Sequence, residues 1–269
     1  MKQKVGIILA FLAFFAFVFC PNCKKEMAYA DEKTEPVMAI IIDDFGGYER
    51  GGVSEMLEIN VPLTCAVIPF VEHTKEDSEM AIKNGHEVIL HMPMESHVNL
   101  PQSWYGPVYV KNYDTIKQAT EKIDDCLKEL PMAKGVNIHI GSGVSRNANL
   151  MAGIIAHLKE RDIYFCDSRT HPDTKCEEAC RMCNAPYLYR DVFLEPHGMK
   201  SYASAVRFLK EGASIALKRG YSVAIGHVGR EGGKDTALAI KNTIKEIEDM
   251  GVRIVPLSVV NERIKNNIV

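Results

Sequence analysis

The chain has 269 residues, of which 46% are apolar and 25% are charged. This composition is that of an ordinary globular protein with one large domain or two small ones, and it argues against an intrinsically disordered chain. The formal net charge of −3 gives no electrostatic reason to expect a nucleic-acid partner.

The first thirty residues have the pattern of a secretory signal peptide. Lys2 and Lys4 precede an apolar run over 5–19, and the small-residue sequence "AYA" ends at Ala30. The apolar run is shorter than the roughly 20 residues that a membrane-spanning helix needs. We therefore expect cleavage, export to the periplasm or the extracellular space, and no stable membrane insertion. An uncleaved N-terminal anchor is the alternative, because the charged "KKE" stands close before the cleavage site.

Short apolar runs alternate with helical periodicity from residue 37 onward. Predicted strands lie at 37–42, 63–68, 87–90, 135–140, 163–166, 221–225 and 252–257. Apolar residues spaced by three and four predict amphipathic helices near 113–130, 150–158, 202–213 and 237–247. Continuous apolar strands that alternate with helices indicate a parallel sheet buried on both faces.

We therefore predict an α/β fold, a distorted (β/α) barrel of about seven strands that forms a single domain. The domain is expected over 37–262, after a signal peptide at 1–30 and a short linker at 31–36, with a C-terminal tail at 263–269. An open doubly wound sheet is the alternative, but no G-x-G-x-x-G follows the first strand to support a dinucleotide fold.

Polar and titratable side chains stand where the predicted strands end. They are Asp43, Asp44, His91, His139, Ser142, Asp167, Arg169 and His227, joined by Arg190 and Asp191 of the segment "YLYRDVFLE". Because the C-terminal strand ends of a β/α barrel form one rim, we expect these groups to share a site. Adjacent carboxylates facing one site repel unless a cation holds one of them, and His with carboxylate ligands is typical of a catalytic zinc or a similar ion. A simple turn that caps the next helix is the alternative interpretation of Asp43 and Asp44.

Three segments that contain these residues resemble known motifs of the polysaccharide deacetylase, or NodB-homology, enzymes. They are "IIDDFG" (41–46), "GHEVILH" (85–91) and "IGH" (225–227). With "LHMPME", "GVNIHIGS", "DSRT" and "RDVFLE", they resemble the divergent polysaccharide deacetylase family over roughly 38–260. The chain departs from the usual pattern at Glu95, Ile138, Glu195 and Val228, where a His, an Asn, an Asp and a Pro respectively are usual.

The resemblance implies an exported, metal-dependent hydrolase that deacetylates N-acetylated amino-sugar polymers, such as cell-wall glycan or a chitin-like polymer, in carbohydrate metabolism. Asp43 would be the general base and His227 the general acid. Asp44, His91 and His139 would hold a divalent metal ion, with Zn²⁺ expected.

Other residues are expected to support this site. Glu95 is expected as a further ligand or close beside the ligands. Asp191 or Asp167 is expected to raise the pKa of His227, oriented by Arg169 or Arg190. Asn137, Ser142 and Trp104 are expected to bind or orient the glycan substrate, although Trp104 could equally pin its loop to the barrel.

Two other functions are consistent with the sequence. A catalytically silent protein could keep the rim for binding cell-wall glycan. The C-x₃-C-x₂-C spacing of Cys176, Cys180 and Cys183 is that of radical SAM enzymes, but it lies past the fifth predicted strand, in a segment of helical pattern. A disulfide or a structural metal clip is the favoured interpretation of these cysteines. The sequence indicates no oligomeric state.

Overall fold

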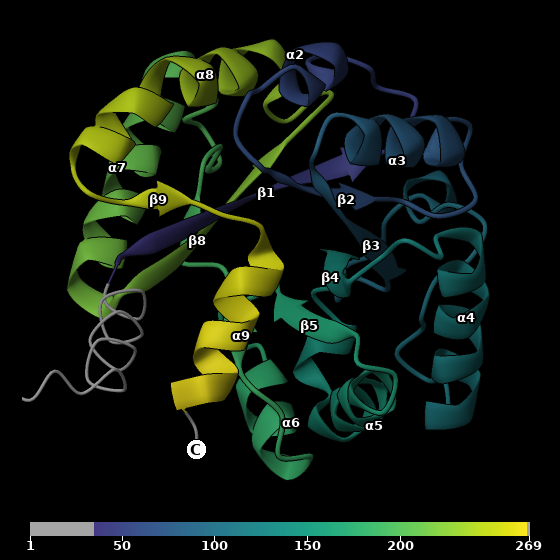
Figure 1. The fold of residues 1–269 in the computed structure, drawn as a ribbon. Coiled ribbons are helices and arrows are strands. Elements are labelled where there is room, and N and C mark those ends of the chain that lie inside the picture. Colours follow the sequence, from purple (N-terminus) through teal and green to yellow (C-terminus); the bar gives the residue numbers. More distant parts are fainter. Residues whose placement is uncertain (1–34, 268–269) are drawn as a thin grey trace, which may run out of the picture. The chain divides into compact units, whose positions relative to one another are not determined.

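The computed structural model describes residues 35–267, so the predicted signal peptide lies outside the described residues. Within that range strands and helices alternate along the chain (Figure 1). The strands are β1 Val37–Phe45, β2 Thr64–Val67, β3 Glu87–Met94, β4 Gly135–Ile140, β5 Tyr164–Asp167, β6 Leu188–Tyr189, β7 Val192–Phe193, β8 Tyr221–His227 and β9 Arg253–Ile254. The helices are α2 Val53–Leu57, α3 Thr74–Lys83, α4 Ile116–Glu129, α5 Ala148–Lys159, α6 Cys176–Met182, α7 Tyr202–Arg219, α8 Gly233–Asp249 and α9 Leu257–Asn267, with 3₁₀ turns η1 Gln102–Trp104 and η2 Val144–Arg146.

The strands form one parallel sheet in the order β6-β5-β4-β3-β2-β1-β8-β7, with β9 beside β1. The two ends of this order, β6 and β7, are joined in sequence by Arg190 and Asp191 alone. The backbone N–H of Arg190 donates to Asp167 of β5, and that of Asp191 donates to Val223 of β8. The chain itself therefore spans the seam of a curled, incompletely closed barrel. The predicted α/β fold with a distorted barrel is confirmed, and the doubly wound alternative is wrong.

Alternate residues of β1 face two apolar clusters. Met38, Ile40 and Ile42 belong to the larger cluster, which includes apolar residues of the surrounding helices. Val37, Ala39 and Ile41 belong to a second cluster, which includes Leu257, Val260 and Ile264 of α9. Because side chains alternate along a strand, Asp43 continues the second series and comes at the C-terminal end of β1.

The apolar run at 252–257 is only partly strand. Only Arg253–Ile254 of the run predicted as a strand at 252–257 pairs with β1, and α9 begins at Leu257. A short apolar run alone does not distinguish a strand from a buried helix. Helix α9 continues past residue 262, where a tail was expected to begin. The four predicted amphipathic helices are confirmed as α4, α5, α7 and α8.

No helix in the described part of the chain has the length and apolar character to cross a membrane. The described cysteines, Cys65, Cys126, Cys166, Cys176, Cys180 and Cys183, are all free thiols, so no disulfide joins them.

The loop after β1 packs closely against the start of α8. Gly52 has a φ of 83°, and a Cβ built there would lie 2.4 Å from the carbonyl carbon of Gly233. The neighbouring residue Gly51 accepts a hydrogen bond from the backbone N–H of Gly229 at 2.7 Å. This approach ties the β1–α2 loop to the β8–α8 loop at the C-terminal rim.

We expect Gly52→Ala to destabilise the fold through both the left-handed backbone and this clash. Gly85→Ala is the matched control, because Gly85 has the same φ of 83° but nothing within 4 Å of the added Cβ. The control should cost only the roughly 1–2 kcal/mol of a left-handed non-glycine residue, and Gly52→Ala should cost more. Denaturant unfolding would measure both. Equal losses would contradict the close packing.

Candidate metal and acid–base site

Asp43 and Asp44 reach the rim together because β1 is bulged there. Ile42 pairs with Cys65 and Phe45 with Val67, so β1 contains one more residue than β2 over this interval. Asp44 has a φ of 71° in the left-handed region. Adjacent side chains of a regular strand point to opposite faces, and a bulge with a left-handed residue changes this. The bulge therefore lets neighbouring carboxylates serve one site.

Asp44, His91 and His139 bring three metal-binding atoms together from β1, β3 and β4. The Asp44 Oδ1 atom lies 3.3 Å from His91 Nε2 and 3.1 Å from His139 Nδ1. The two ring nitrogens lie 3.1 Å from each other. These atoms all lie within 4.8 Å of one another and form the one such group found among residues 35–267.

The chemistry of these donors fits a divalent metal ion. Asp44 Oδ1 is buried and makes no hydrogen bond within the described chain. Although burial opposes ionisation, His139 and His91 hold the pKa of the Asp44 carboxyl well below its usual range. The other ring nitrogens are occupied, since His91 Nδ1 contacts Asn137 Oδ1 at 2.7 Å and His139 Nε2 contacts the Trp104 carbonyl oxygen at 3.0 Å. Each imidazole can therefore present its remaining lone pair to a metal.

Asp43 lies between this cluster and His227. Its side chain is buried, and its Oδ1 atom accepts a hydrogen bond of 2.7 Å from Asn137 Nδ2. Asn137 is fully buried and also contacts His91, so one amide fixes both the first histidine of the cluster and the neighbouring carboxylate. The second oxygen of Asp43 lies 3.9 Å from His227 Nε2.

His227 is held by Glu195, two residues past β7. His227 Nδ1 lies 3.1 Å from Glu195 Oε2, and the His227 backbone N–H donates to Glu195 Oε1. Thr236 also donates to that carboxylate, at 2.5 Å. Burial alone would lower the pKa of His227, but the Glu195 hydrogen bond and the charges of Asp44 and Asp43 raise it to about 9. His227 is therefore protonated at neutral pH.

The expectation that Asp191 or Asp167 faces His227 is wrong. Asp191 pairs with Arg219 and accepts the backbone N–H of Val223. Asp167 is fully buried and accepts hydrogen bonds from Arg169 N, Thr174 Oγ1 and Tyr187 OH at 2.8, 3.1 and 3.1 Å respectively.

The contact of Glu195 with His227 was not predicted from the sequence, because it depends on how β7 pairs with β8. Phe193 pairs with Ile225. Two further residues on each strand bring Glu195 opposite His227, whereas Asp191 lies opposite Val223. One feature of the sequence could have indicated this contact. Glu195 is a carboxylate two residues past the apolar pair Val192–Phe193, at a position where an Asp is usual in the family that the sequence resembles.

Glu95 does not join the metal-binding group. Its Oε2 atom accepts the backbone N–H of Asn112 at 2.7 Å, and its carbonyl oxygen accepts that of Gly143 at 3.0 Å. Ser142 Oγ contacts Ser96 Oγ at 2.9 Å and His97 Nδ1 at 2.8 Å. Both residues therefore connect the loops that follow β3 and β4.

The remaining expected residues lie around the rim. The Trp104 backbone contacts His139 while its side chain is 54% exposed, so the same residue anchors its loop and offers a free ring. The Arg190 side chain donates to the carbonyl oxygens of Ser168 and Arg169. Arg169 and Arg190 were expected to orient a carboxylate beside His227, but the carboxylate there is Glu195, and neither arginine pairs with it among the described residues.

The cysteine motif does not form a metal-binding cluster. Cys176 and Cys180 are buried on α6, and burial raises the pKa of both thiols, for Cys180 to about 12. Cys176, Cys180 and Cys183 are not among the metal-binding groups of the described residues. The radical SAM interpretation therefore lacks structural support.

We expect Asp44→Ala and His91→Ala to lose stoichiometric divalent metal, because each removes one of three converging donors. His157→Ala is the matched control, since His157 pairs with Asp124 on the helical surface. Metal analysis after reconstitution with zinc and dialysis would measure the retained ion. Retention by both site variants would show that the cluster is not a metal site.

We expect Glu195→Gln to lower the pKa of His227 from about 9, because the variant removes the anionic hydrogen-bond partner. Since folding raises this pKa above 6.5, the associated stabilisation is complete below pH 6.5 and is lost as the pH rises through 9. NMR titration of His227 in metal-free protein would measure the shift. Asp191→Asn is the control, and a shift there without one in Glu195→Gln would contradict the assignment.

Comparison with known proteins places this site in a family. Residues 40–260 match the family described as divergent polysaccharide deacetylase. The uncharacterised protein YibQ of Escherichia coli K12 is 28% identical over 194 residues, which are 71% of this chain and 58% of that protein. An uncharacterised Haemophilus influenzae protein is 25% identical over 210 residues, which cover 78% of this chain and 71% of that protein. This chain thus spans little more than half the length of the Escherichia coli relative.

Solved structures share the fold. An uncharacterised protein from Agrobacterium tumefaciens C58 has a TM-score of 0.72 at 18% identity, covering 86% of this chain and 94% of its own. A CE4 family pseudoenzyme from Bacillus anthracis has a TM-score of 0.52 at 10% identity, covering 84% of this chain and 65% of its own. These similarities concern the fold alone. The match over most of the sequence identifies the chain itself: it belongs to the divergent polysaccharide deacetylase family.

Proposed function

We propose that this protein is an exported, metal-dependent hydrolase that removes N-acetyl groups from an amino-sugar polymer, such as a cell-wall glycan. The observation that supports the proposal best is the position of Asp43, between a three-donor cluster and a protonated histidine. A base and an acid on either side of one space are what amide hydrolysis requires. The N-terminal signal pattern supports the proposal of export.

Asp44, His91 and His139 would hold the ion, for which we propose Zn²⁺ because nitrogen and oxygen donors with an open position suit it. When bound, the ion would polarise the acetamide carbonyl as a Lewis acid and make water more acidic. Asp43 is the proposed general base and takes a proton from the attacking water. Its hydrogen bond from Asn137 fixes the carboxylate while leaving Oδ2 on the side of His227.

His227 is the proposed general acid. An amide nitrogen is a poor leaving group until it is protonated, so the departing amine needs a donor. With Nδ1 of His227 held by Glu195, Nε2 carries the proton on the side that faces Asp43. In the metal-free protein the Glu195 hydrogen bond and the charges of Asp44 and Asp43 raise the pKa of His227 to about 9, which favours a proton on this ring.

The exposed ring of Trp104 is the proposed stacking surface for a sugar. The contact of its carbonyl oxygen with His139 Nε2 supports this proposal, because the residue is held next to a proposed metal ligand. Arg169 and Arg190 are proposed to contact substrate oxygens from the other side of the rim. Asn137 and Ser142 are proposed to orient the neighbouring residues, because both are held in internal hydrogen bonds.

A catalytically silent glycan-binding protein is the second candidate. One protein of similar fold is itself described as a pseudoenzyme, and a shared fold does not guarantee activity. Acetate release by zinc-loaded protein from an N-acetylglucosamine hexamer or from peptidoglycan fragments would favour the hydrolase. Binding of the same glycans without acetate release would favour the silent protein.

We expect Asp43→Asn to keep the metal and to lose turnover by ~10²–10⁴-fold, as for removal of a general base. The asparagine can still accept the hydrogen bond from Asn137, so the fold around it is conserved. Glu49→Gln is the control, because Glu49 is an exposed carboxylate of the same loop. Acetate release and metal content would be measured together.

Two outcomes would contradict these roles. If Asp43→Asn loses metal while Asp44→Asn retains it, the roles of the two aspartates are reversed. If both variants keep metal and full acetate release, neither carboxylate serves the reaction.

A further inference from the structure

The cations around the rim differ in whether the protein itself neutralises them. In the loops after β1 and β8, Arg50 and Arg230 each form an ion pair with a carboxylate, and Lys200 of the loop after β7 pairs with Glu231. In the segments that follow β4, β5 and β6, the described residues provide no ion-pair partner for the arginines at three positions. These are Arg146, Arg169 and Arg190. Charges without an internal partner on one side of a site favour a ligand of opposite sign.

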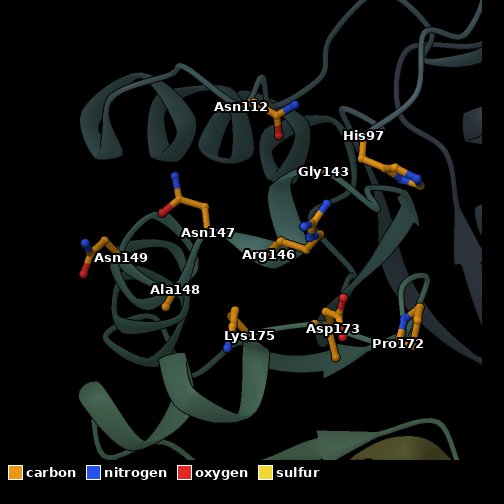
Figure 2. A pocket seen from close by; sticks show the side chains of 11 residues that line it. His97, Asn112, Gly143, Arg146, Asn147, Ala148, Asn149, Pro172, Asp173 and Lys175 are labelled. Atoms are coloured by element: carbon orange, nitrogen blue, oxygen red, sulfur yellow. The ribbon is translucent and has the colours of Figure 1, made fainter.

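A polar cavity of about 970 Å³ lies on that same side. Figure 2 shows Arg146 in the midst of the labelled side chains, with Asn112 and His97 from the loop after β3 and Asp173 and Lys175 from the loop after β5. Amide, imidazole and charged groups predominate in its lining. Such groups match the hydroxyl, amide and carboxylate groups of a glycan.

The loops that follow β3 and β4, the strands that carry His91 and His139, contribute to the cavity lining. His97, in the lining, contacts Ser142 through Nδ1 at 2.8 Å, and Ser142 is the third residue after His139. The lining residue Gly143 donates its backbone N–H to the carbonyl oxygen of Glu95, four residues after His91. These hydrogen bonds tie the cavity lining to the loops that leave the two strands carrying His91 and His139.

Arg146 is the cation best placed to bind an anion there. Lys175 lies 3.7 Å from Glu178, so its charge is partly offset by α6. Asp173 is the one carboxylate of the lining, and it lies 3.9 Å from His171 Nδ1.

We propose that this cavity is a subsite for a sugar that carries a carboxylate, next to the N-acetylated sugar in the same glycan. A guanidinium binds a carboxylate through two parallel hydrogen bonds, which suits the exposed Arg146 side chain. This inference rests on the proposed function, since it names the class of glycan that the same site would act on. It predicts an acidic polymer rather than a neutral one.

The test compares two oligosaccharides of equal length. One alternates uronic acid with N-acetylhexosamine, and the other is a neutral N-acetylglucosamine oligomer. Calorimetry with full zinc-loaded protein should show tighter binding of the acidic oligomer, with an affinity that falls as salt rises. Arg146→Gln should weaken acidic binding about 10-fold, as for loss of a charge-assisted hydrogen bond, and leave neutral binding unchanged. Arg230→Gln is the control, because Arg230 is a rim arginine already paired with Glu49.

The outcomes separate this subsite from the proposed activity. An acidic preference that Arg146→Gln abolishes supports the subsite even if no acetate is released, in which case the hydrolase proposal fails alone. Equal binding of the two oligomers, binding of neither, or an equal effect of Arg146→Gln and Arg230→Gln would overturn the subsite. Acetate release under those conditions would leave the hydrolase proposal standing.

Discussion

The bulge at the end of β1 is the constraint on which the rest of the site depends. It requires a left-handed backbone at Asp44, which costs of order 1–3 kcal/mol at a non-glycine residue. Surrounding contacts hold this conformation. Asp77 accepts the backbone N–H of Gly46 at 2.7 Å and pairs with Arg50, while the Val228 N–H donates to the carbonyl oxygen of Asp43. Without the bulge, one carboxylate would face away from the site.

The bulge places Asp43 at the centre of a chain of contacts that crosses the barrel mouth. Asn137 joins Asp43 to His91 and thereby to the metal-binding atoms. On the other side, Glu195 holds His227 with its Nε2 atom 3.9 Å from Asp43. Asp43, Asn137, His91 and Glu195 are buried, so their hydrogen bonds are made in a region of low dielectric, where an unpaired polar group is costly. Asp43, His227 and the three candidate metal-binding side chains are thus held by contacts with one another.

The incomplete closure of the sheet gives the rim two different halves. Arg190 and Asp191 carry the chain across the seam between β5 and β8, and the next residues bring Glu195 to His227. Among the described residues Arg190 has no ion-pair partner on one side of this link, whereas Asp191 is neutralised by Arg219 on the other. The seam therefore contributes both the carboxylate that holds His227 and part of the unpaired positive charge.

The sequence by itself determined the alternation of strands and helices, because continuous apolar runs and spacings of three and four are local properties of the chain. It also identified the strand ends as the site, which brought Asp43, Asp44, His91, His139 and His227 into consideration. It could not assign Glu195 to His227 or remove Asp191, because that choice depends on the register of β7 against β8. Nor could it show that a helix begins at Leu257, where the strand expected at 252–257 ends, and continues into the tail expected at 263–269, because this helix packs in one apolar cluster with β1. Register, the bulge and the pairing of rim charges arise only when distant segments meet, and so the tertiary structure alone decided them.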